Sequence, residues 1–307
     1  MHSRGLAERP AYGDNQAARP VGPPRVPAVQ AGGIRDCHIN VDGIRTHYLE
    51  AGTGDPIVLL HSGEFGGRAE LSWEYVMPVL AESYRVIAPD WLGYGGTAKI
   101  HDFGGKRARM MSHMRRTLEV LAIENAHLVG NSMGATYLAK MVANPGLSLQ
   151  ARSITLISGG GFAPDNAARR ATLEYDCTRE AMVRLLQALF ADPVWWTDDS
   201  YVDRRQAAAT EPGAWEALAV ARFRSPLEPP RSEFGQPDDT RYEAIGSPTL
   251  FIVGANDLLR QPGYADRPAR QISGARVATV PDSGHCPNIE RAPEVCALLL
   301  DFFKSAG

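Results

Sequence analysis

The chain has 307 residues, of which 44% are hydrophobic and 22% are charged, and its formal net charge is −3. Such a chain is long enough to bury a sizeable core. It carries neither the basic stripe of a nucleic-acid-binding protein nor an apolar run long enough to span a membrane. The N-terminus lacks the apolar core of a signal peptide, so we expect a cytoplasmic protein.

The four cysteines are also typical of a protein in the reducing cytoplasm. Cys37, Cys177, Cys286 and Cys296 are not spaced like metal ligands, and we expect reduced thiols. Cys286 adjoins a histidine that is introduced below, and we expect it to be a packing residue. The sequence therefore predicts no metal site.

The chain begins with a proline-rich stretch, residues 1–33, for which we expect a disordered or loosely packed tail. A hairpin is predicted over 38–49, with Asp42-Gly43 as its two-residue turn. Strands and helices then alternate. We expect strands over 57–60, 85–88, 126–129 and 153–158, and helices over 73–81, 106–121 and 135–143. This alternation predicts an α/β fold with a mostly parallel sheet covered on both faces.

The alternation stops between residues 162 and 242, where no buried strand is predicted. One helical face there carries Met182, Leu185, Leu186 and Leu189, and an alanine-rich stretch covers 207–221. We interpret 162–242 as a helical cap inserted into a core formed by 34–161 and 243–307. The sheet resumes with strands over 249–254 and 276–280, and the last helix covers 292–303. Within the cap, Trp195 and Trp196 either line a substrate pocket or pack the cap onto the core.

A glycine-flanked serine lies between the strand 126–129 and the helix 135–143. The motif reads Gly130-Asn131-Ser132-Met133-Gly134. A Gly-x-Ser-x-Gly sequence on a sharp strand-to-helix turn is typical of the nucleophile elbow of serine hydrolases. The glycines leave room for strained backbone, and the helix N-terminus favours developing negative charge. Because ordinary turns also match this pattern, the interpretation depends on partners elsewhere in the chain.

Two later segments supply those partners. Asp257 follows the strand 249–254, and His285 follows the strand 276–280, so both lie just past the carboxyl end of a strand. A serine hydroxyl needs a base to take its proton, and the base needs an orienting acid. We therefore predict the triad Ser132, His285 and Asp257, which requires no metal or organic cofactor. Asp282 and Asp90 are the alternative acids.

An oxyanion hole needs two N–H donors. We expect one from the backbone of Met133 and the other from the loop after the strand 57–60. In that loop Gly63 is favoured, with Ser62 as the alternative. We expect His61, at the start of the loop, to shape the backbone rather than act as the base.

The chain resembles the α/β-hydrolase superfamily over nearly everything after residue 36, and within it the meta-cleavage product hydrolases. The resemblance is carried by the motif 130–134, by residues 88–95 (APDWLGYG) and by the cap stretch 192–213. It implies the α/β-hydrolase fold and serine-dependent cleavage of a carbon–carbon bond in a ring-opened aromatic dienol acid. It also implies that a cap arginine, Arg204 or Arg205, binds the substrate carboxylate through bidentate bonds. Asn131, beside the serine, is a further candidate substrate-binding residue.

Two residues depart from the family pattern. Glu64 stands in an oxyanion loop that the family keeps small and glycine-rich, and Cys286 stands where the family often has tryptophan. Since a carboxylate near an oxyanion opposes it, we expect Glu64 to point away, to be protonated, or to contact a substrate hydroxyl or cation. The alternatives to carbon–carbon hydrolysis are a carboxylesterase or lactonase, and a non-catalytic ligand-binding module. The expected partner is a small molecule, with a homo-oligomer left open.

Overall fold

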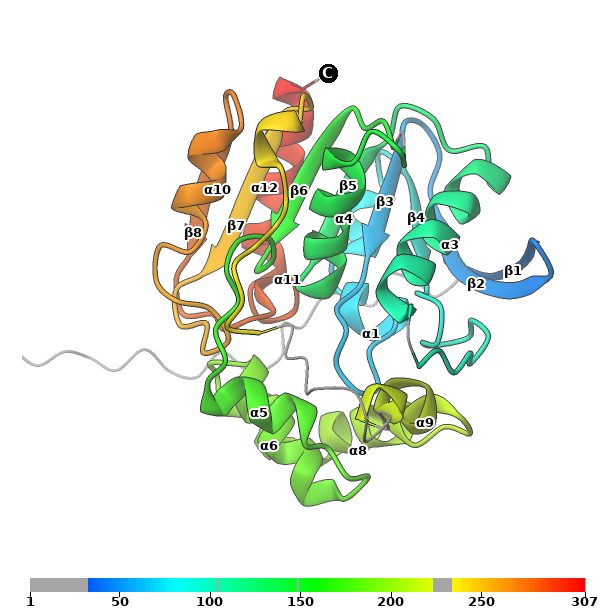
Figure 1. The fold of residues 1–307 in the computed structure, drawn as a ribbon, viewed down its shortest axis with the longest axis vertical. Helices are drawn as coiled ribbons and strands as arrows, with labels where there is room; N and C mark the ends of the chain where they lie inside the picture. Colours follow the sequence, from blue (N-terminus) through cyan, green and yellow to red (C-terminus); the bar gives the residue numbers. More distant parts are fainter. Residues whose placement is uncertain (1–32, 104, 148, 223–233, 307) are drawn as a thin grey trace, which may run out of the picture.

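The computed structural model describes residues 33–103, 105–147, 149–222 and 234–306 (Figure 1). The tail expected over residues 1–33 lies outside these ranges except for Gly33. In the described part of the chain, eight strands form one sheet in the order β1-β2-β4-β3-β5-β6-β7-β8. Their bounds are β1 Arg35–Val41, β2 Ile44–Ala51, β3 Pro56–Leu60, β4 Arg85–Pro89, β5 His127–Asn131, β6 Ser153–Ile157, β7 Thr249–Gly254 and β8 Arg276–Val280.

The predicted hairpin forms the edge of this sheet. β1 and β2 pair antiparallel, with Val41 opposite Ile44. The turn residues Asp42 and Gly43 have φ angles of 50° and 89°, as a two-residue turn of type I′ requires. β2 also pairs antiparallel with β4, whereas the strands from β4 to β8 are parallel to their neighbours. The α/β prediction of a mostly parallel sheet is confirmed.

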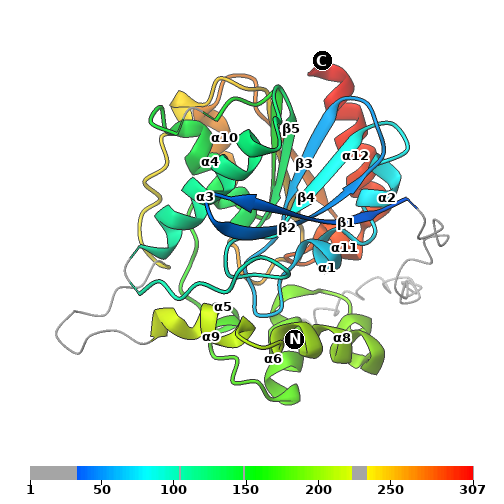
Figure 2. The same ribbon diagram turned by 90° about the vertical axis from the view of Figure 1, so that its right-hand side faces the viewer.

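Helices cover both faces of the sheet (Figure 2). Their bounds are α1 Ala69–Trp73, α2 Met77–Leu80, α3 Lys106–Val120, α4 Met133–Ala143, α10 Asp266–Gln271, α11 Pro287–Glu290 and α12 Ala292–Ser305. The single helix expected over 73–81 is wrong, since two short helices stand there. Pro78 has no N–H to donate to the carbonyl of Glu74, and this breaks a continuous helical ladder.

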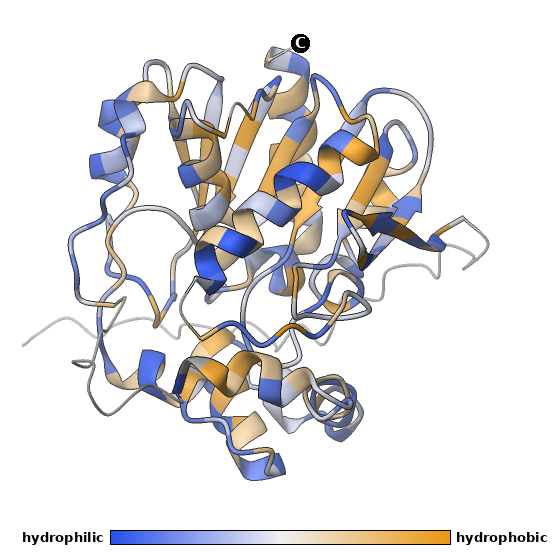
Figure 3. Cartoon of the chain, turned by 45° about the vertical axis from the view of Figure 1, so that its right-hand side comes forward, coloured by the Kyte–Doolittle hydropathy of each residue, from blue (hydrophilic) through white to orange (hydrophobic). Residues whose placement is uncertain are grey.

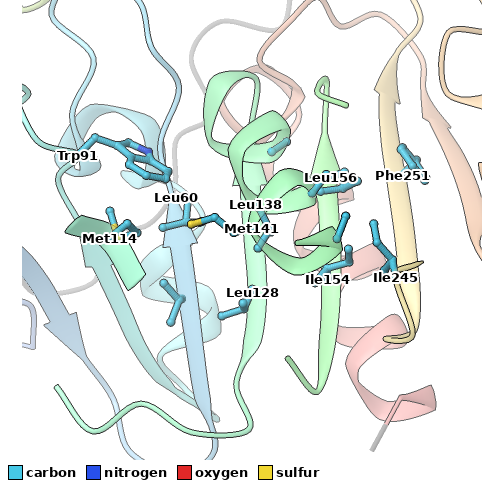
Figure 4. Close-up of a cluster of buried hydrophobic side chains, with 14 of the residues drawn as sticks. Leu60, Trp91, Met114, Leu128, Leu138, Met141, Ile154, Leu156, Ile245 and Phe251 are labelled. Carbon is cyan, nitrogen blue, oxygen red and sulfur yellow. The ribbon is translucent and has the colours of Figure 1, made fainter. Parts of the chain in front are cut away.

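The core lies in two layers, one on each face of the central strands. On one face, Met110, Met114 and Leu118 of α3 and Leu138 of α4 pack against β3, β5 and β6 (Figure 4). On the other, residues of α1, α2 and α12 pack against the same strands. The central strands are accordingly the most hydrophobic part of the ribbon (Figure 3). The methionine stripe of α3 is core, as its helical spacing predicts.

The segment between β6 and β7 is helical in its described part. It contains α5 Ala167–Leu173, α6 Arg179–Leu189, α7 Val194–Thr197, α8 Asp199–Ala209, α9 Ala214–Ala219 and the 3-10 turns η1 Val220–Arg222 and η2 Tyr242–Ala244. Helices α5 to α9 lie together beyond the carboxyl ends of β3 and β7 (Figure 1). They have their own apolar cluster, in which Met182, Leu185, Leu186 and Leu189 are buried. Among the described residues, no helix combines the length and apolarity that crossing a bilayer requires.

Candidate active site

Ser132 lies at the sharp turn between β5 and α4. Its φ of 54° is left-handed backbone, which places the side chain outside the line of both elements. The neighbouring glycines make this turn possible. A Cβ on Gly130 would lie 2.5 Å from the backbone nitrogen of Ala135, and one on Gly134 would lie 2.3 Å from the carbonyl oxygen of Leu60. The local geometry is therefore that of a nucleophile elbow.

The structure brings the three predicted triad residues together. His285 Nε2 is 2.6 Å from Ser132 Oγ, and His285 Nδ1 is 2.8 Å from Asp257 Oδ2. Asp257 Oδ1 accepts a hydrogen bond from the backbone of Leu259, which orients the carboxylate. Three side chains from three loops thus form one hydrogen-bonded chain. In such a chain the imidazole can take the proton of the hydroxyl while the carboxylate stabilises the imidazolium.

The two alternative acids lie elsewhere. Asp90 is buried and accepts hydrogen bonds from His47 Nδ1 and from the backbone of Ala69 and Gly96, so it organises the loop after β4. Asp282 is exposed and faces Arg291. Neither forms a hydrogen bond with His285.

The loop after β3 lies directly against the elbow. A Cβ on Gly63 would lie 2.5 Å from Met133 Sδ, and Gly63 and Met133 line the same cavity as Ser132. Tyr94 holds this loop by donating its hydroxyl to the Gly63 carbonyl at 2.9 Å. Ser62 is buried, and its carbonyl is 2.6 Å from His61 Nδ1. His61 Nε2 accepts from the backbone of Trp91, so the ring is committed to shaping the loop.

A cavity of about 640 Å³ opens above Ser132. Its walls come from the oxyanion loop, from α3 and α4, from the cap helices and from the loop after β7. This volume suits a small organic substrate. Among the described residues, no cluster of His, Cys, Asp and Glu could hold a metal ion.

Glu64 and Arg205 form a buried ion pair beside this cavity. Arg205 Nη2 donates to Glu64 Oε1 at 2.5 Å, and the exposed fractions of the two side chains are 0% and 4%. Burial raises the pKa of Glu64, but the positive charge of Arg205 and the hydrogen bonds to the carboxylate together outweigh it and hold the pKa below its usual value. Glu64 is therefore ionised, and its charge is neutralised by the cap.

The other predicted substrate-binding residues are not on the cavity wall. Arg204 is on the surface and pairs with Glu74 at 3.0 Å. Trp195 stacks on Phe190 inside the cap, and Trp196 is half-buried against the same apolar cluster. Asn131 is buried and donates to the carbonyl of His285 at 3.2 Å. The structure gives these residues packing and positioning contacts.

Comparisons with known proteins agree with this arrangement. The model of the alpha/beta hydrolase family matches residues 57–298. The chain belongs to the alpha/beta hydrolase family. This hydrolase is 31% identical to the 2-hydroxy-6-oxo-6-(2'-aminophenyl)hexa-2,4-dienoic acid hydrolase of Metapseudomonas resinovorans, a match that covers 87% of this chain and 90% of that one. It is 32% identical to the 2-hydroxymuconate semialdehyde hydrolase of Pseudomonas sp. (strain CF600), over 86% of this chain and 92% of the other.

A solved structure shows the same likeness. The meta-cleavage product hydrolase from Pseudomonas fluorescens IP01 superposes on this hydrolase with a TM-score of 0.78 and 25% identity, covering 88% of this chain and 98% of that one. The sequence-based prediction of an α/β-hydrolase fold with a likeness to the meta-cleavage product hydrolases is confirmed.

Three residues at the site carry no signal in the sequence. Arg169 of α5 and Arg260, after β7, both line the cavity. Glu290 of α11 accepts from the backbone N–H groups of Gly284 and Ala191, so it ties the loop of His285 to the cap loop between α6 and α7. No local pattern marks them, because each is brought to the site only by the packing of cap against core.

The surroundings of His285 predict how the activity of this hydrolase depends on pH. Burial of the ring, together with the charges of Arg169 and Arg260, lowers the pKa of His285 below 6.5 and outweighs the opposing effect of Asp257. A base must be neutral to accept the proton of Ser132, so activity is present above that pKa and lost as the pH falls through it. We expect kcat/KM to decline on acidification with a midpoint below 6.5. A pH profile checks this, and a midpoint above 6.5 would contradict it.

Proposed function

We propose that this alpha/beta hydrolase is a serine hydrolase that cleaves a carbon–carbon bond in a ring-opened aromatic dienol acid. The observation that carries the chemistry is the hydrogen-bonded chain from Ser132 through His285 to Asp257, which lies on the wall of a cavity of substrate size. The names of the relatives, which act on hexa-2,4-dienoic acids and on 2-hydroxymuconate semialdehyde, support the substrate class.

The mechanism follows from the positions of the groups. Ser132 Oγ attacks a carbonyl carbon of the substrate and gives its proton to His285 Nε2. The negative charge that develops on the carbonyl oxygen is met by the backbone N–H groups of Met133 and Gly63. The carbon–carbon bond then breaks, and His285 delivers its proton to the leaving carbon, which prior ketonisation of the dienol makes stable enough to depart. Water, activated by His285, releases the acyl group from Ser132.

Hydrolysis of an ester or lactone is the second candidate, and one observation favours it. The cap arginine that the resemblance assigns to the dienoate carboxylate is Arg204 or Arg205. Arg204 is on the surface, and Arg205 is already neutralised by Glu64. The same triad and oxyanion donors serve ester hydrolysis without change.

A direct comparison of two substrate classes tests the proposal. Purified protein is offered ring-fission dienols, whose visible colour is lost on cleavage, and p-nitrophenyl esters. We expect kcat/KM on the dienols to exceed that on the esters. The reverse order would assign the protein to the esterases, and tight binding of the dienols without turnover would make it a binding module. Ser83→Ala, a substitution at an exposed serine, is the control, and it should keep the wild-type activity on both substrate classes.

A further inference from the structure

Two of the basic residues that line the Ser132 cavity are buried arginines that form no ion pair among the described residues. The residues Arg169 and Arg260 are 8% and 7% exposed, and neither forms an ion pair with an acid in the part of the chain that the structure describes. Burying a charge is unfavourable unless an opposite charge lies in contact with it. An anion bound between two such charges would therefore offset the unfavourable free energy of burying them.

The contacts of Arg169 hold its guanidinium in place but leave donors unused. Nη2 donates to the carbonyl of Leu259 at 3.0 Å, the group lies 4.6 Å from the centre of the Phe234 ring, and Nε has no partner. Burial and the neighbouring charge of Arg260 lower the pKa of Arg169 to about 10, which still leaves it charged at neutral pH. A guanidinium fixed in this way is pre-organised for a planar anion.

The guanidinium of Arg260 donates to three backbone carbonyls, including that of Phe162 at 3.2 Å, and reaches α4. Its Nε and Nη1 donate to the carbonyls of Ser158 and Gly160 at 3.1 and 3.2 Å, and Nη2 reaches Thr136 Oγ1 at 3.5 Å. Thr136 is one helical turn after Ser132 and donates to the Ser132 carbonyl. Arg260 thus contacts α4 one helical turn after the reacting serine.

The acids of the cavity wall are already engaged. Glu64 pairs with Arg205, and Asp238 and Asp239 both pair with Lys140. The charge of Glu64 is thus neutralised by Arg205. Arg169 and Arg260 form no ion pair within the described residues, and the nearby carboxylate of Asp257 is hydrogen-bonded to His285. An anionic group in the cavity is therefore attracted to the wall that carries Arg169 and Arg260.

We propose that Arg169 and Arg260 form a carboxylate-binding subsite of the Ser132 cavity. This deepens the proposed function, on which it rests, because it places the acidic group of the substrate at the junction of α5 with the loop after β7. Arg205, which the sequence resemblance puts forward, does not fill this role since Glu64 holds it.

Binding of two matched probes tests the subsite without relying on turnover. Benzoate and benzamide have nearly the same shape and differ in charge, and both are titrated into wild-type protein by calorimetry. We expect benzoate to bind more tightly than benzamide. Arg169→Gln should weaken benzoate by about 10- to 100-fold, as loss of a charged hydrogen bond does, and leave benzamide unchanged. Arg169→Lys should retain part of the benzoate affinity.

The matched control is Arg170→Gln, which removes the same charge from the same helix at a residue that pairs with Asp165 on the surface. It should change neither affinity. Benzamide binding reports that each variant is folded. Equal affinities of the two probes for wild-type protein, or an equal loss of both in Arg169→Gln, would overturn the subsite. If benzoate binding depends on Arg169 but the protein does not cleave dienols, the subsite stands and only the proposed reaction is wrong.

Discussion

Ser132→Ala is expected to lower kcat on the true substrate by roughly 10⁶-fold, the size of effect seen when a serine nucleophile is removed from a working triad. The hydroxyl is the group that forms the acyl bond, and no other hydroxyl is hydrogen-bonded to His285 Nε2 within the described residues. The measurement is the single-turnover rate of substrate loss. Since the substitution removes one hydroxyl without creating a clash, substrate binding and the thermal unfolding midpoint should be retained.

The control for this experiment is Ser83→Ala, at an exposed serine near the amino end of β4, which should keep the wild-type rate. A Ser132→Ala protein that keeps the full rate would remove the nucleophile from the mechanism. Asp257→Asn extends the test to the acid. It should lower kcat by about 10⁴-fold, because the amide no longer holds the imidazole in the tautomer that accepts the serine proton.

Glu64→Leu is expected to destabilise the protein by about 3–5 kcal/mol, because it leaves the charge of Arg205 buried and unpaired. Two further Arg205 donors, Nε and Nη1, already lack partners, so nothing else in the described structure takes over from the carboxylate. The measurement is the free energy of unfolding in urea at neutral pH. Arg205→Met should be destabilising as well, since it strands the carboxylate of Glu64.

The double variant Glu64→Leu/Arg205→Met completes a double-mutant cycle with these two single variants. It removes both charges at once, so its loss of stability should be much smaller than the sum of the two single losses. The neighbouring residue provides the control: Arg204→Met breaks the partly exposed pair with Glu74 and should change stability by less than about 1 kcal/mol. Additive losses in the double variant would show that the two residues act independently.

The sequence predicted most of the fold because its signals are local. The strand before Ser132 and the helix after it are recognised from apolar runs and from the glycines of the turn, and the structure shows the close approach that requires those glycines. The single helix expected over 73–81 is wrong, because Pro78 lacks the N–H that a continuous helix needs at that position. The triad was predicted from residue type, order along the chain and position after strands, and the structure brings Ser132, His285 and Asp257 within hydrogen-bonding distance.

The candidate substrate-binding residues could not be predicted from local signals in the same way. The sequence left Arg204 and Arg205 as equal candidates for a carboxylate, and the cap helix α8 turns one to the surface and the other into a buried pair. For Glu64 the sequence left three possibilities, to point away, to be protonated, or to contact a substrate hydroxyl or cation, and it did not single out Arg205 as the partner. No local pattern in the sequence indicates Arg169 or Arg260, because the packing of cap against core brings them to the cavity.

The sequence by itself determined the order of elements, the elbow and the position of each candidate triad residue just after a strand, because backbone strain and apolar periodicity act between residues that are close along the chain. Only the tertiary structure decided which charges meet in the cavity. Glu64 and Arg205 are 141 positions apart, and they pair because the cap folds over the ends of the strands. The energy of a buried charge depends on what surrounds it after folding, so its partner is a property of the packed molecule.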